Sequence, residues 1–123
     1  MDMSEQKTLL EEAVAAAADT FEVELPATEA VLCDELIDRR RERWEAGGGA
    51  EVDPAQLDQR LDQVRAAWED LGFEVRLSTL DDGSQPALFA TKGEVGVSAS
   101  SGPPQDDIVG VSIGGSTECG DIS

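Results

Sequence analysis

The chain has 123 residues, of which 40% are apolar, and its 27 acidic and 9 basic side chains give a formal charge of −18. This length allows one domain with a sizeable core, and the apolar fraction excludes a disordered acidic tail. The negative charge repels phosphate backbones and anionic lipid headgroups, so we expect no nucleic-acid partner. No stretch is apolar for long enough to predict a transmembrane segment.

The first predicted element is a helix over about residues 4–19. Apolar positions there step by four, three and four, as one face of a helix does: Leu10, Val14, Ala17 and Phe21. Asp2 and Glu5 have the spacing of a capping box, which supports a helix start at this point. Residues 21–25 then alternate before a proline, which predicts a short extended segment or strand.

Residues 28–52 are ambiguous, because propensity and periodicity disagree. Residues 28–46 are rich in helix formers, whereas apolar or small residues alternate with glutamates over 44–52. The three glycines 47–49 suit a twisted or bulged strand better than a helix end. We expect a strand from about Arg41 to Val52, with a helix as the alternative.

A second helix over about 53–71 has both start and stop signals. Asp53 is the predicted N-cap, Pro54 occupies the first helical position, and Gly72 follows the end. The core-facing stripe steps by four, three, four and three: Leu57, Leu61, Val64, Trp68 and Leu71.

Four alternating apolar runs follow, and the turns between them predict a meander of strands. The first turn is Asp81–Ser84, the second is Lys92–Gly93, and a longer loop covers Ser100–Asp107. The predicted fold class is therefore α+β. We expect an antiparallel sheet of about four to five strands, with the N-terminal helix and the second helix (about 53–71) packed on one face.

Cys33 and Cys119 are the only cysteines. If the last strand keeps its register, Cys119 shares the parity of the apolar positions in 109–113 and turns toward the face where the helices pack. A disulfide between the two cysteines would close a loop of about 87 residues and stabilise the fold by up to about 4–5 kcal/mol. The even number favours an oxidised pair and export, and two unpaired thiols in a cytosolic protein are the alternative.

Catalytic and metal-binding constellations are sparse. The chain contains no histidine, which removes most nucleophilic triads and histidine-ligated metal centres. The carboxylate pairs Asp81–Asp82, Asp106–Asp107 and Glu11–Glu12 lie in predicted turns or on a solvated face, and no calcium-loop spacing occurs. We therefore expect no enzyme, no cofactor and no metal.

Four of the nine basic residues fall within residues 39–43. Acidic residues surround them, which favours a self-neutralising surface: Glu35, Asp38, Glu42 and Glu45. The alternative is a patch for an anion or an acidic partner. In a strand, that patch would consist of Arg39, Arg41 and Arg43, which share one face.

The chain combines a helix, a cysteine, a tryptophan-containing glycine-rich strand, an Asp-Pro helix and a closing meander. The residues that carry this pattern are Cys33, Trp44–Val52, Asp53, Trp68, Gly72, Phe73, Ala87–Ala90, Ser116, Thr117 and Cys119. Over residues 33–119 it resembles small secreted lipoproteins of high-GC Gram-positive bacteria. The resemblance implies an exported, disulfide-linked protein. The chain lacks the signal and lipidated cysteine of such proteins, as a shortened form would, so a cytoplasmic location stays open.

These observations favour a non-catalytic, extracytoplasmic α+β domain, lipoprotein-like and associated with the cell envelope. We expect it to bind a protein or an envelope ligand whose identity the sequence leaves open. The alternative is a cytosolic protein of the immunity or inhibitor type. Its acidic face would capture a basic enzyme through fast, salt-sensitive association.

Overall fold

The computed structural model describes residues 2–24, 28–36, 39–80, 85–102 and 107–120. Within them lie two α-helices, one short 3-10 turn and six strands, so the chain is α+β as predicted. In chain order the elements are α1 (Met3–Thr20), β1 (Thr28–Leu36), β2 (Arg39–Val52), η1 (Pro54–Gln56), α2 (Leu57–Asp70), β3 (Glu74–Leu80), β4 (Gln85–Lys92), β5 (Val95–Ser101) and β6 (Val109–Ser116).

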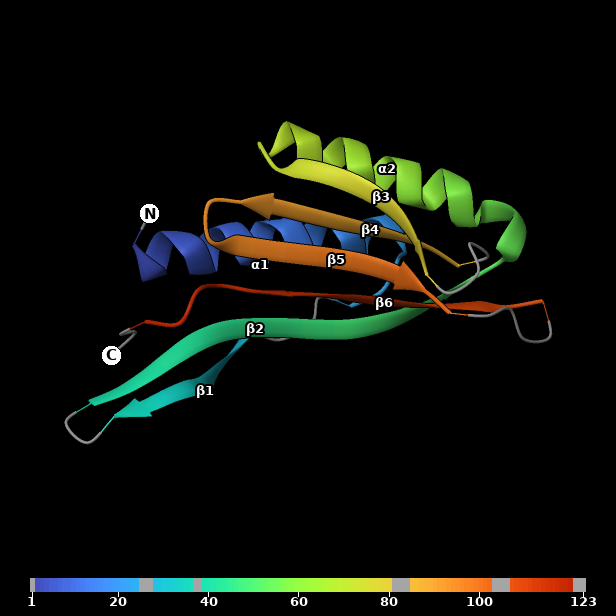
Figure 1. The fold of residues 1–123 in the computed structure, drawn as a ribbon. Coiled ribbons are helices and arrows are strands. Elements are labelled where there is room, and N and C mark those ends of the chain that lie inside the picture. Colours follow the sequence, from blue (N-terminus) through green and yellow to red (C-terminus); the bar gives the residue numbers. More distant parts are fainter. Residues whose placement is uncertain (1, 25–27, 37–38, 81–84, 103–106, 121–123) are drawn as a thin grey trace.

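The six strands form one antiparallel sheet in the order β1-β2-β6-β5-β4-β3. The four C-terminal strands are the predicted meander. β2 pairs with β6, so the front half of the chain extends the sheet on that side, and β1 lies at its margin (Figure 1).

The sheet has one strand more than the four to five predicted, and the addition is β1. Its residues include good helix formers, yet they pair with β2 along the whole strand, so cross-strand contacts override local propensity. β2 begins at Arg39, two residues before the predicted start at Arg41, and it ends at Val52 as predicted.

The structure has no strand over Phe21–Glu24. Phe21 instead ends α1, and its amide donates to the Ala17 carbonyl oxygen at 3.1 Å. Glu22 follows with a φ of 57°, which turns the chain away from the helix axis. Leu25, the last residue of the predicted segment, lies outside the described residues.

Both helices pack on one face of the sheet (Figure 1). Eight of the nine residues in the two predicted stripes are buried: Leu10, Val14, Ala17 and Phe21 from α1 and its cap, and Leu57, Leu61, Val64 and Trp68 from α2. The ninth, Leu71, is half-buried. Trp68 is fully buried, and its Nε1 donates to the Ala13 carbonyl oxygen at 2.8 Å. That bond joins α2 to α1 inside the core.

The predicted end of α2 is confirmed, whereas its start differs from the prediction: α2 begins at Leu57 after Gln56, which makes no side-chain cap, and Asp53 caps a 3-10 turn instead. The Asp53 carboxylate accepts from the Ala55 amide at 2.9 Å, and a 3-10 turn over Pro54–Gln56 precedes the helix. Gly72 has a φ of +93°, a conformation that glycine adopts without strain. The Phe73 amide then donates to the Trp68 carbonyl at 3.0 Å and closes the helix.

α1 approaches the sheet closely because small residues meet at the contact. Ala13 and Ala17 are fully buried on the helix side. On β6, a Cβ added at Gly115 would lie 2.5 Å from the Gly96 carbonyl oxygen and 2.8 Å from Leu10 Cδ1. The position therefore admits no side chain without moving backbone or helix.

Gly115→Ala should lower the free energy of unfolding by about 1–3 kcal/mol, because the added methyl overpacks the contact between α1 and the sheet. Urea unfolding followed by circular dichroism measures the change. The matched control is Gly110→Ala on the same strand, where an added Cβ meets nothing within 4 Å. Equal unfolding midpoints for the two variants would contradict the close packing of α1.

Candidate functional site

The most distinctive feature of the structure is a cross-linked junction between the two ends of the chain. Cys33 and Cys119 form a disulfide with their Cα atoms 6.0 Å apart and a sequence separation of 86. Cys33 lies where the pairing of β1 with β2 shifts by one residue, between Leu32 and Asp34. Such a bulge re-aims a side chain, here toward the C-terminal segment.

Backbone hydrogen bonds hold the same segment along β2, beyond the end of β6. The amide of Glu42 donates to the Gly120 carbonyl at 2.8 Å, and the amide of Gly120 donates back at 2.9 Å. The Thr117 amide donates to the Trp44 carbonyl at 3.0 Å, and the Trp44 amide donates to the Thr117 hydroxyl oxygen at 3.0 Å. Residues 117–120 thus continue the pairing with β2 up to the disulfide.

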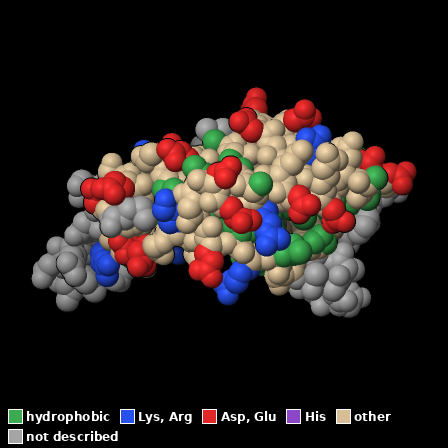
Figure 2. Space-filling view, turned by 90° about the horizontal axis from the view of Figure 1, so that it is seen from above, with side chains coloured by type: hydrophobic (Ala, Val, Ile, Leu, Met, Phe, Trp, Pro, Cys, Tyr) green, Lys and Arg blue, Asp and Glu red, His purple; other side chains and the backbone are tan. Residues whose placement is uncertain are grey.

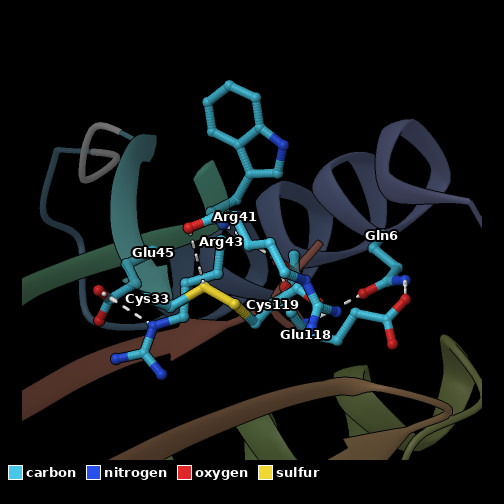
Figure 3. The surroundings of a disulfide bond; sticks show 9 residues. Gln6, Cys33, Arg41, Arg43, Glu45, Glu118 and Cys119 are labelled. Carbon is cyan, nitrogen blue, oxygen red and sulfur yellow. Dashed lines mark hydrogen bonds and ion pairs between the residues drawn. A yellow bond between two sulfur atoms is a disulfide. The ribbon is translucent and has the colours of Figure 1, made fainter. Parts of the chain in front are cut away.

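The arginines of the predicted patch contact different partners. Arg41 Nη2 donates to the Cys119 carbonyl oxygen at 2.7 Å, so this side chain braces the disulfide. Arg43 Nε lies 3.3 Å from Glu45 Oε2, as an ion pair without hydrogen-bond geometry between partly exposed side chains. Figure 3 shows the two guanidinium groups turned to different partners. Arg39 belongs to β2, but its side chain lies outside the described residues, and anion binding by the three arginines stays a prediction.

Gln6 contributes to the junction and was not predicted to do so. It is fully buried near the start of α1, its Nε2 donates to Glu118 Oε1 at 2.7 Å, and its Oε1 accepts from the Glu118 amide at 3.1 Å (Figure 3). The signal was present in the sequence: Gln6 lies four residues before Leu10 and extends the apolar stripe of α1 with a polar residue. A buried amide at such a position needs partners, and Glu118 supplies both.

A cation–π contact closes the junction on the side of α1. Lys7 Nζ lies 4.3 Å from the ring centroid of Trp44, which is half-buried at the margin of the core. The junction therefore gathers residues from α1, β1, β2 and the C-terminal segment. Its contacts are suited to holding these parts in place.

The predicted carboxylate pairs contribute little to any site. Asp81, Asp82 and Asp106 lie outside the described residues. Asp107 is exposed, and Glu11 and Glu12 lie on the outer side of α1. Within the described ranges, no three His, Cys, Asp or Glu side chains gather closely enough to hold a metal ion, and no helix is long and apolar enough to span a membrane.

The described surface also has hollows. One of them, of about 880 Å³, is open and lies between the turn after α1 and the paired ends of β2 and β6, with Glu22 and Glu51 on its lining. A smaller and more enclosed groove of about 270 Å³ lies between α2, β3 and β4. Its lining is mainly apolar, which distinguishes it from the larger hollow.

Comparison with protein-family models, with curated proteins and with solved structures finds no match to this chain. The likeness to secreted lipoproteins therefore depends on the motifs of the sequence alone. Function has to be inferred from the cross-linked junction, the charge of the surface and the groove beside β3.

Replacing both cysteines, as Cys33→Ser with Cys119→Ser, should lower the free energy of unfolding by up to about 4–5 kcal/mol, because the unfolded chain regains the freedom of a long loop. Urea unfolding of the variant and of the unreduced chain measures the difference. Reduction of the unaltered chain should give the same shift. An unfolding midpoint that neither treatment moves would contradict a closed disulfide.

Gln6→Leu should destabilise the fold by about 0.5–1.5 kcal/mol, because it removes two hydrogen bonds that join α1 to Glu118. Hydrogen exchange at the Glu118 amide should rise with it. Gln63→Leu, at an exposed position of α2, makes the same chemical change and serves as the control. Slow exchange at Glu118 in the Gln6 variant would show that the pair is not needed.

Proposed function

We propose that this chain is a non-catalytic, extracytoplasmic domain of the lipoprotein-like kind that binds a protein or cell-envelope ligand. The single observation that carries this proposal is the Cys33–Cys119 disulfide. Disulfides persist in oxidising compartments and are rare in the cytosol, where thiols are kept reduced. The junction around the bond supports the same interpretation, because Arg41 and Gln6 brace the segment that carries Cys119.

A binding role is supported by the surface. The outer side of α2 exposes four acidic residues: Asp58, Asp62, Glu69 and Asp70. Figure 2 shows acidic side chains spread over the face seen from above, with fewer basic ones between them. Together with the formal charge of −18, this favours a partner that carries positive charge.

The same acidity supports a second candidate function, that of a cytosolic inhibitor or immunity protein for a basic enzyme. The two candidates differ in compartment and in the state of the cysteines. Binding of a positively charged partner should weaken as salt is added for both candidates, so the compartment and the cysteines distinguish them.

The compartment and the thiols can be tested together in the cells that make the protein. Cells are lysed with an alkylating reagent present, and the intact mass of the protein is measured in the cytosolic, envelope and medium fractions. The proposal predicts protein in the envelope or medium with neither cysteine labelled. Protein in the cytosolic fraction with both cysteines labelled would contradict it and favour the inhibitor.

A further inference from the structure

We propose that the outer edge of β3, together with the groove beneath it, is a docking site for an extended segment of a partner protein. The segment would carry an apolar side chain flanked by basic ones. This inference rests on the binding role proposed above and names the chemical class of the partner. The mode of binding is strand addition, in which backbone hydrogen bonds supply affinity and a side-chain pocket supplies selectivity.

β3 is an available edge. It is the last strand of the sheet, with β4 on one side and no described strand on the other. Its seven residues pair with β4 without a register shift, so the strand is regular along its length. Edge strands are commonly protected by charged side chains, by proline or by a bulge. β3 has no proline and no bulge, and its two charged residues, Glu74 and Arg76, lie in its first half, so the stretch from Leu77 to Leu80 carries no charge. The opposite edge, β1, is interrupted by the bulge at Cys33.

An apolar groove lies beside this edge, on the helix-bearing face. Its volume is about 270 Å³, and its apolar lining consists of Leu61, Leu77, Pro86 and Leu88. Leu61 and Leu88 are buried at the bottom, whereas Leu77 is 58% exposed, more than any other large hydrophobic residue described. Figure 1 shows β3 curving away from the N-terminal part of α2, in the region of the groove. The site therefore fits one aliphatic side chain.

The charges around the groove select the flanking residues of the partner. Asp58 and Asp62 are exposed on the helix side of the lining. Arg65, the remaining charged residue there, lies 3.1 Å from Glu69 Oε1, which balances its charge. The rim is therefore net negative and complements lysine or arginine.

The alternation of side chains in a strand gives the pattern of the partner. In a segment added to β3, every second side chain faces the helices. An aliphatic residue placed against Leu77 would bring the residues two positions before and after it to the same face, near Asp58 and Asp62. The expected pattern is basic, any, aliphatic, any, basic.

A capped peptide of the sequence Thr-Lys-Thr-Leu-Thr-Lys-Thr tests this site directly. Nitrogen-15 NMR spectra of the oxidised protein are recorded at low salt during titration with the peptide. We expect amide shifts along β3 and at Asp58 and Asp62. Replacing both lysines of the peptide by glutamate should weaken binding by about tenfold or more, because it removes charge complementarity. Alternate residues of a strand turn their amides to the same side, so two further peptides carry an N-methyl group either on the leucine or on both threonines beside it. One of these two peptides should bind about tenfold more weakly, because it lacks the backbone donors that face β3.

Matched protein variants locate the site. Leu77→Ser should weaken binding by about tenfold, whereas Leu32→Ser, which alters an exposed leucine on the opposite edge, should leave affinity unchanged. The peptide controls use the unaltered protein and are independent of any folding defect in the variants.

Several outcomes would overturn the inference. These are no amide shifts up to millimolar peptide, shifts centred on β1 or α1, unweakened binding of both N-methylated peptides, or pairing of two copies of the chain through β3 before peptide is added. Each of these is distinguishable from failure of the proposed function. The compartment and thiol state are measured without peptide, and β3 can fail to bind in a protein that is exported and oxidised.

Discussion

The Cys33–Cys119 bond is the constraint on which the shape of the molecule depends at the β1–β2 end. The core proper lies between the two helices and the central strands, and Trp68 joins the helices within it. By contrast, no described side chain of β1 is buried, and over the described side chains of β2, from Arg41 on, burial begins at Ala46. The hairpin is therefore held by pairing, by contacts of Arg41 and Gln6 with the C-terminal segment, and by the disulfide.

This construction gives the two edges of the sheet different properties. The β1 edge is bulged at the cross-link, and its neighbour β2 carries arginines that are engaged with Cys119 and Glu45. The β3 edge is regular and carries the exposed Leu77 beside an acidic rim. The regularity of the β3 edge is the reason for proposing strand addition there, and its acidic rim is the reason for proposing a basic partner.

Sequence periodicity predicted the parts of the fold that bury side chains. The stripes of both helices and the alternation of β3–β6 were clear because one face of each element enters the core. β1 was missed because none of its described side chains is fully buried, so its sequence shows no clear period. Phe21 suggested a strand, although it completes the stripe of α1. The groove at Leu77 could not be predicted, since it depends on how β3 and α2 diverge in space. The role of Gln6 could be assigned only once Glu118 was known to face it.

Hydrogen exchange of the folded chain, oxidised and reduced, tests most directly whether the disulfide holds the hairpin. On reduction, amide exchange in β1, in residues 41–45 and in residues 117–120 should accelerate strongly, because local opening no longer strains a covalent link. Amide exchange in β4 and β5 should accelerate only by the amount that corresponds to the fall in the free energy of global unfolding. Uniform acceleration across the sheet, or unchanged protection of β1, would contradict the account.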